Sequence, residues 1–212
     1  MGGDLHYFTF IGIHPRNYPM PQYSKKRPAM RIKYNSPVIL TYSILSMCVL
    51  AFSGNGMLAG YFSSPAHLSL FNPYFYFRLV SYITAHGSWS HLIGNFMIIL
   101  LVGPLLEEKY GSGALLEMIF ITAITTALLN AILFSNSLIG GSGIAFMLIL
   151  LSSFSNIRSK EIPLTFILIA TLYIGSEVLS TLKVDRISQF SHLAGGFIGA
   201  GYGFFRSGKR DL

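Results

Sequence analysis

A serine flanked by glycines lies in the segment Gly140-Gly141-Ser142-Gly143, directly before a long apolar run. At the start of a helix, free N–H groups and the positive end of the helix dipole favour an anion, and the glycines let another group approach the hydroxyl closely. These properties suit a nucleophilic serine. The alternative is an ordinary Gly/Ser turn between two helices, which this segment alone does not exclude.

A histidine, His192, lies within the last apolar run, in the sequence SHLAGGFIGA. An ionisable side chain inside a membrane span is costly, which makes it a functional candidate. Gly195 and Gly199 follow at GxxxG spacing, which lets a second helix pack closely on the face that carries His192. We expect that second helix to be the one that begins at Ser142. A structural histidine and a dimer seam are the alternatives.

Two more histidines and an asparagine, His86, His91 and Asn95, fall in the sequence HGSWSHLIGNF. His91 and Asn95 are four residues apart and share one helical face. Because no Cys, Asp or Glu accompanies them, a hydrogen-bonding cluster is favoured over a transition-metal site. We expect these groups to meet Ser142 and His192 beneath the membrane surface. That arrangement predicts a serine hydrolase site for a substrate that is itself in the membrane.

The composition is that of a membrane protein. Only 11% of the 212 residues are charged, against roughly 25% in globular proteins. Hydrophobic residues make up 52%, and the mean hydropathy is +0.55. The net charge of +7 does not indicate nucleic acid, because the cations fall between apolar runs and form no basic face. The single cysteine, Cys48, excludes an internal disulfide and a CxxC site.

Uncharged stretches predict an all-α membrane protein with six transmembrane helices. Lys and Arg gather before the first helix and after the second, fourth and sixth, which predicts that both termini are cytoplasmic. The fourth helix is short against the roughly 20 residues of a full span, so Ser142 should lie below the outer membrane surface. The expected helices cover residues 37–53, 91–106, 112–134, 142–156, 163–181 and 187–205.

The remaining segments have a different composition. Residues 1–36 are polar, basic and rich in Pro and Tyr, and we expect them to form a mobile cytoplasmic tail. Met30 is a plausible alternative translation start, in which case residues 1–29 are not part of the protein. The six helices form one domain, 37–206, and residues 207–212 form a second cytoplasmic tail. Residues 54–85 form the only long loop that we expect.

In this frame the sequence resembles the rhomboid family of intramembrane serine proteases, from about residue 37 to residue 205. The resemblance implies a Ser-His dyad, in which Ser142 attacks the scissile carbonyl and His192 takes its proton. It also implies an oxyanion hole formed by His91, Asn95 and the backbone N–H of Ser142. The motifs that carry it, in order, are Arg78, then His86, His91 and Asn95, then Glu107 with Gly111 and Ser112, then the GxSG at 140–143, and then HxxGxxxG at 192–199.

The resemblance further implies substrates that are single-span membrane proteins, cut near the outer end of their helix amid membrane lipid, with no metal, organic cofactor or nucleic acid involved. Phe146 stands where the family has a tyrosine that packs on the catalytic histidine. A six-helix core resembles the bacterial form, which predicts a multi-pass protein of a bacterial plasma (inner) membrane. A rhomboid-like pseudoprotease that binds helices without cutting them is the alternative. The supporting residues are Gly140, Gly143, Phe146, Gly195, Gly199, His86 and Arg78.

Overall fold

The computed structural model describes residues 34–53, 57–157 and 187–208, together with six isolated positions between 164 and 175. The chain divides into two units, Met1–Lys33 and Tyr34–Leu212, and only the second contains described residues. Most of the expected N-terminal tail and most of the helix expected at 163–181 therefore lie outside the described residues. Every regular element within the described ranges is a helix.

In the described part of the chain, helices occupy five of the six expected ranges, and the six described positions of the remaining range, 163–181, are also helical. The second of these five helices is longer at both ends than expected, because the Ser88 hydroxyl accepts the His91 N–H (3.1 Å) at its start and the helix continues past Pro104 to Tyr110. The elements are α1 (Pro37–Phe52), α2 (Met57–Phe62), α3 (Pro73–Ser81), the 3-10 turn η1 (Tyr82–Thr84), α4 (Trp89–Tyr110), α5 (Ser112–Leu133), α6 (Ser142–Ile157) and α8 (Ile187–Gly208).

In the described part of the chain, two helices have the length and the apolar composition needed to cross a membrane. These are α4 and α5, each of 22 residues. Helix α1 and the segment Ser142–Ser153 of α6 are also apolar, but they are shorter.

The long loop expected at 54–85 contains two short helices and a 3-10 turn, so the expectation of a plain loop is wrong. Helix α3 begins where the Asn72 side chain accepts the Tyr74 N–H (3.0 Å), with Pro73 at the first helical position. Asparagine at the N-cap followed by proline is a favoured helix start. The last residues of α3 lead directly into η1, which ends two residues before His86.

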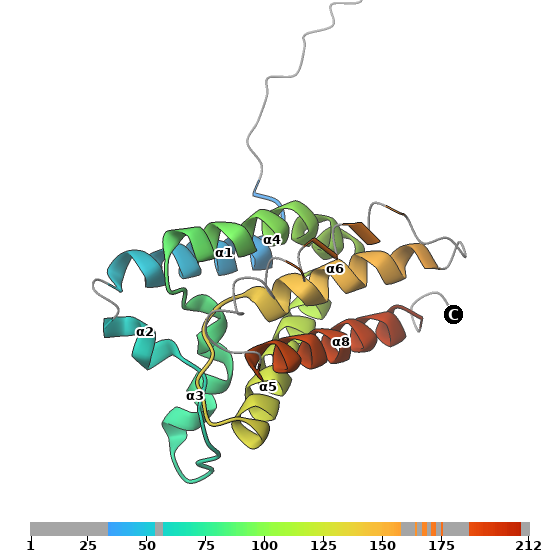
Figure 1. Cartoon of the computed structure of the whole chain (residues 1–212). Coiled ribbons are helices and arrows are strands. Elements are labelled where there is room, and N and C mark those ends of the chain that lie inside the picture. Colours follow the sequence, from blue (N-terminus) through green and yellow to red (C-terminus); the bar gives the residue numbers. More distant parts are fainter. Residues whose placement is uncertain are drawn as a thin grey trace, which may run out of the picture. The chain divides into compact units, whose positions relative to one another are not determined.

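The long helices pair in defined directions, as their side-chain contacts show. Helices α1 and α4 run antiparallel: the rings of Tyr42 and Phe96 lie 5.1 Å apart, and the Ile39 side chain lies against Gly103 further along α4. Helix α6 lies between α4 and α8 (Figure 1) and contacts both. The side chains from Ser142 to Leu151 are all buried, as expected for an apolar helix at the centre of a bundle.

One buried carboxylate joins the starts of two helices. Glu107, near the end of α4, accepts the N–H groups of Val38 and Ile39 (3.0 Å each) and the Ser112 hydroxyl (2.7 Å). The side chain of Ser36 makes no capping hydrogen bond to α1, so Glu107 satisfies two of the donors that every helix start leaves unpaired. Helices α1 and α5 therefore begin at the same level.

Candidate active site

The glycine-serine segment forms a tight turn at the start of α6. Ser142 is the first residue of the helix and is only 2% exposed, and Gly143 after it is also buried. Gly140 has a φ of +119°, a backbone conformation that strongly favours glycine. The turn therefore places a serine hydroxyl at a buried helix start, where the helix dipole favours developing negative charge.

The backbone of this turn is held by residues from the segment before α4. Ser64 and Leu138 exchange two hydrogen bonds, from the Ser64 N–H to the Leu138 carbonyl and from the Leu138 N–H to the Ser64 hydroxyl, each 2.8 Å. The Gly140 N–H donates to the Tyr82 carbonyl (3.1 Å). The position of Ser142 thus depends on residues that lie far from it in the sequence.

His86 also holds the backbone of the turn before Ser142. Its Nε2 accepts the Gly141 N–H (3.3 Å), and its Nδ1 lies 3.3 Å from the Thr84 carbonyl. A carbonyl can only accept, so we assign the proton to Nδ1 and the neutral form to this ring. Burial, followed by the nearby His91, lowers the pKa of His86 to about 4, which keeps Nε2 available as an acceptor at neutral pH.

His91 and Asn95 both lie against the glycine turn. A Cβ atom at Gly140 would stand 2.9 Å from the His91 Nε2 and 3.6 Å from the Asn95 Nδ2. Asn95 is buried, and the rings of His91 and His86 meet edge to face at 5.1 Å. The structure thus places two polar side chains from one face of α4 against Gly140, which precedes Ser142 by two residues. Among the described residues, no three His, Cys, Asp or Glu side chains are grouped to hold a metal ion.

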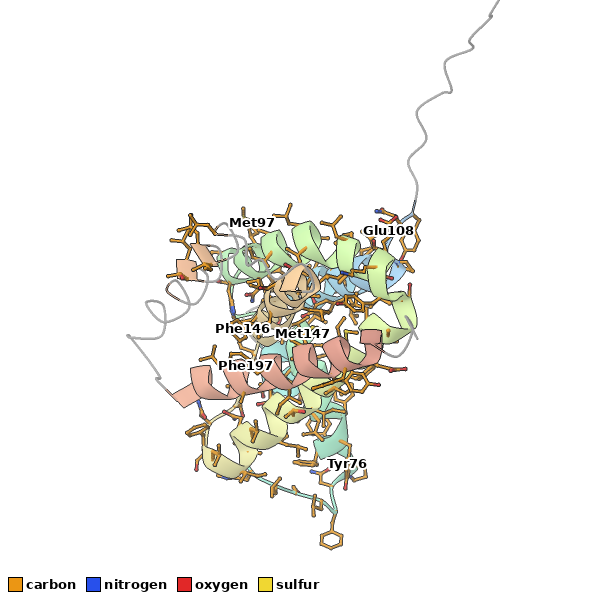
Figure 2. The ribbon with its side chains drawn as sticks, turned by 90° about the vertical axis from the view of Figure 1, so that its right-hand side faces the viewer. Tyr76, Met97, Glu108, Phe146, Met147 and Phe197 are labelled. Carbon is orange, nitrogen blue, oxygen red and sulfur yellow. The ribbon has the colours of Figure 1, made fainter. Side chains whose placement is uncertain are left out.

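Helices α6 and α8 pack in parallel with a defined register. A Cβ atom at Gly196 would stand 2.5 Å from the Phe146 Cδ1, and one at Gly203 would stand 2.8 Å from the Leu151 Cδ1. Figure 2 shows Phe146 of α6 beside Phe197 of α8, whose rings meet edge to face at 5.6 Å. One turn before the Phe146 contact, positions 142 and 192 therefore lie at the same level. The side chain of His192 lies outside the described part of the chain.

Gly195 and Gly199 do not face the helix that was expected. They lie against Thr126 and Thr122 of α5, so closely that a Cβ atom at either glycine would collide with the threonine hydroxyl. Helices α5 and α8 run antiparallel along this seam. Consecutive helical residues point about 100° apart, so Gly195 faces α5 while Gly196 faces α6. The GxxxG pair is a close-packing motif, as expected, but its partner is α5.

Arg78 organises the segment that holds the serine turn. Its guanidinium donates to the Ser63 carbonyl (2.6 Å), the Ser64 carbonyl (2.7 Å) and the Ser137 hydroxyl (3.5 Å). Ser64 in turn binds Leu138. Arg78 therefore fixes the position of Ser64 and contacts the start of the chain that leads to Ser142.

Several residues of the site were not predicted from the sequence. Ser64 and Tyr82 carried no signal of their own, because their partners lie 74 and 58 residues away, and the partner of Gly196 lies 50 residues away. Tyr42 also reaches the turn: its hydroxyl donates to the Ile83 carbonyl (2.8 Å) and would stand 2.5 Å from a Cβ atom at Gly141. Only Gly196 had a local indication, the second glycine of the GG pair.

Comparisons with known proteins place the chain in a family. Residues 74–209, nearly two thirds of the chain, match the Rhomboid domain. Rhomboid-related protein 1 of Caenorhabditis elegans is 26% identical over 138 residues, which cover 60% of this chain and 39% of that protein. Rhomboid-like protein 15 of Arabidopsis thaliana is 28% identical over 195 residues, which cover 81% of this chain and 47% of that protein. The matched region thus spans less than half of each relative.

The matched residues contain the serine turn, His86, His91 of α4, Arg78 and the glycine seams of α8. The domain begins within α3, so α1 precedes it. Together with the apolar helices, this match identifies a membrane protein. The chain belongs to the rhomboid family.

Proposed function

We propose that this protein is an intramembrane serine endopeptidase with a Ser142-His192 dyad. The observation that carries the proposal is the α6–α8 register, in which positions 142 and 192 lie at the same level one turn before the Phe146–Gly196 contact. In the first step the Ser142 Oγ attacks the scissile carbonyl while His192 takes the hydroxyl proton. His192 then passes this proton to the leaving amine, and water hydrolyses the acyl-enzyme.

The oxyanion of the tetrahedral intermediate would be bound by His91, Asn95 and the backbone N–H of Ser142. The proximity of both side chains to Gly140 supports this role. The start of α6 adds the positive end of its dipole at the same place. Donors that are already positioned in a water-poor site stabilise a developing charge strongly.

The proposed peptidase domain comprises residues 37–206, with six transmembrane helices and both termini on the cytoplasmic side, flanked by the tails 1–36 and 207–212. Twelve of the 15 Lys and Arg residues would then lie on the cytoplasmic side. Because α6 and α8 run parallel, Ile157 and Ile187 lie at opposite ends of this pair. The 29 residues between them are enough for one more helix of about 20 residues.

The proposed substrates are single-span membrane proteins that are cut near the outer end of their helix. The burial of Ser142 supports a substrate that enters the bundle from the membrane. We place the protein in a plasma membrane as a multi-pass protein. The two relatives come from a nematode and a plant, and neither supports the bacterial origin expected from the sequence.

The test uses detergent-purified full chain and a tagged single-span substrate. Wild type should release a fragment, whereas Ser142→Ala and His192→Ala should not. Ser153→Ala, which alters another buried serine of α6 about 16 Å along the helix, should cleave normally. A fluorophosphonate probe should label wild type but not Ser142→Ala, and chelators should leave cleavage unchanged.

Undiminished cleavage by Ser142→Ala would end the proposal. If wild type retains the substrate helix on a pull-down but cuts none of the substrates offered, the protein is a rhomboid-like pseudoprotease instead.

A further inference from the structure

A groove of about 790 Å³ opens between α1, α3 and α5. This volume lies within the range of roughly 300–1,000 Å³ that is typical of small-molecule sites. Large apolar side chains from all three helices form most of its wall. Prominent among them are Val38, Leu45, Tyr76, Phe77, Leu116 and Phe120. Several of these side chains stay substantially exposed, including Tyr76 (53%) and Phe77 (50%), so the groove is accessible.

Most hydroxyl groups of the groove wall already have partners within the chain, whereas the buried Ser81 hydroxyl has none among the described residues. The Thr41 hydroxyl pairs with that of Tyr34 (3.1 Å), the Thr84 hydroxyl donates to the Ser81 carbonyl (2.7 Å), and Tyr42 donates to Ile83. A ligand in the groove therefore needs no polar groups along most of its length. This chemistry suits a hydrocarbon chain.

The groove also has the depth of one lipid leaflet. Glu107 holds the starts of α1 and α5 at one level. Leu116 and Phe120 lie four and eight residues beyond Ser112, or about 6 and 12 Å along α5. Since half of the hydrocarbon core is about 15 Å thick, the groove extends from near the membrane interface to near the midplane. An acyl chain of a phospholipid occupies this range of depth.

A transmembrane helix is a poorer occupant than an acyl chain. Helices pack closely in membranes where small residues let their backbones approach, as at the Gly195 and Gly199 seam with α5. The groove wall instead presents aromatic and branched side chains, such as Phe77, Leu116 and Phe120. Side chains of this kind can pack around a flexible chain, but they hold a helix backbone at a distance.

We propose that this groove holds one acyl chain of a membrane phospholipid and that Tyr42 links its occupancy to the serine turn. One part of the Tyr42 side chain lines the groove, while its hydroxyl lies against Gly141, the residue before Ser142. An acyl chain that packs on Tyr42 steadies the turn on which the serine depends. The effect on catalysis rests on the proposed peptidase function, whereas the binding of lipid does not.

The binding test uses the full chain in phosphatidylcholine vesicles that contain phosphatidylcholine with a diazirine on one acyl chain. After irradiation, labelled peptides are mapped by mass spectrometry. Label should concentrate on the groove residues of α1, α3 and α5, well above Leu101 and Leu105 of α4, which are each 67% exposed and do not line this groove. If all exposed apolar residues were labelled to the same extent, the proposal would be overturned.

Matched variants sharpen this test. Leu116→Trp fills the groove and should lower its labelling by about tenfold, in line with the cost of overpacking a formed site. Leu101→Trp, on an exposed face of α4, should leave the labelling unchanged. Thermal unfolding of each variant in detergent establishes that it is folded. Equal labelling of the groove in both variants would overturn the proposal.

Two further measurements separate the groove from the peptidase site. Tyr42→Phe should keep the label in the groove but lower the rate of substrate cleavage, because it removes only the hydroxyl next to Gly141. Unchanged cleavage would overturn the link to the serine turn. If an added single-span substrate displaces the label from the groove, the occupant is a substrate helix and the lipid assignment is wrong. If the wild-type protein is labelled at the groove and does not cleave any substrate, the peptidase function is refuted and the binding of lipid is not.

Discussion

Gly196 of α8 lies directly against the ring of Phe146 on α6, with room for no side-chain atom between them. A Cβ atom at position 196 would stand 2.5 Å from the ring and 3.3 Å from the backbone nitrogen of Met147. Ser142 and His192 are each one turn away from this contact. The distance between the proposed nucleophile and base is therefore set by a residue that has no side chain.

Replacing Gly196 with valine should force α6 and α8 apart and lower the cleavage rate at least about 100-fold, since a misplacement of about 1 Å between reacting groups has an effect of that size. Gly201→Val is the matched control, because a Cβ atom at Gly201 of the same helix meets nothing within 4 Å. Initial rates on a tagged substrate, together with the melting temperature of each variant, measure the effect. A Gly196→Val protein that cleaves like wild type would contradict the proposed register.

The acceptor at His86 Nε2 can be tested by two amide substitutions. A glutamine oxygen can reach the place of Nε2 and accept the Gly141 N–H, whereas the shorter asparagine reaches only the place of Nδ1. We expect His86→Gln to cleave within about tenfold of wild type, and His86→Asn to lose about 1–3 kcal/mol of unfolding free energy, the cost of a buried donor without a partner. The turnover number should fall in the asparagine variant with little change in KM. If His86→Gln and His86→Asn lost equal amounts of cleavage rate and of unfolding free energy, Nε2 would not be the acceptor that holds the Gly141 N–H.

Stability should depend on pH through His86. Its pKa is lowered to about 4 in the folded chain, against about 6.5 for a free histidine. Between these values the unfolded state binds more protons, so stability rises with pH and reaches its full value above about 6.5. Unfolding free energy should fall by up to about 3 kcal/mol from pH 7 to pH 4, at 1.36 kcal/mol per pKa unit.

Thermal unfolding in detergent across this pH range measures the effect, with His86→Gln as the control that removes the titrating group. The slope between pH 4 and 6.5 should be shallower in the variant. Identical pH profiles of wild type and variant would show that His86 is not the group responsible.

Glu107 and its neighbour Glu108 offer a matched pair. Glu107 is buried and accepts three hydrogen bonds, while Glu108 is exposed. Hydrogen bonds to charged groups contribute about 1.5–3 kcal/mol each. Glu107→Gln, which keeps one acceptor oxygen, should lower the unfolding free energy by about 2–3 kcal/mol. Glu108→Gln should change it by about 0.5 kcal/mol or less. Similar melting temperatures for the two variants would contradict the role of Glu107.

The sequence predicted the long helices well, because in this chain charge-free stretches and helices coincide. Ser112 and Ser142 were both expected as first helical residues, and both begin helices in the structure. The helix α3 was missed because it has only nine residues, Pro73 included, which are too few for a hydrophobic period to stand out.

The parts of the site that could not be predicted depend on distant pairs. Nothing in the sequence near Ser64 or Leu138 indicates that they exchange two hydrogen bonds. The GxxxG spacing at Gly195 indicates that a helix packs closely, but not which one. Local periodicity reports which residues share a face, and only the folded bundle decides which neighbour that face meets.

The parallel seam between α6 and α8 also orders events during synthesis. Its contacts join positions about 50 residues apart, and a growing chain contains α6 well before α8. While the ribosome is still translating the region between them, the proposed nucleophile Ser142 would lack its proposed base, His192. A newborn molecule would therefore be unable to attack neighbouring proteins in the membrane until α8 has docked. In this way the order of translation would prevent cleavage of membrane proteins by an incompletely translated chain.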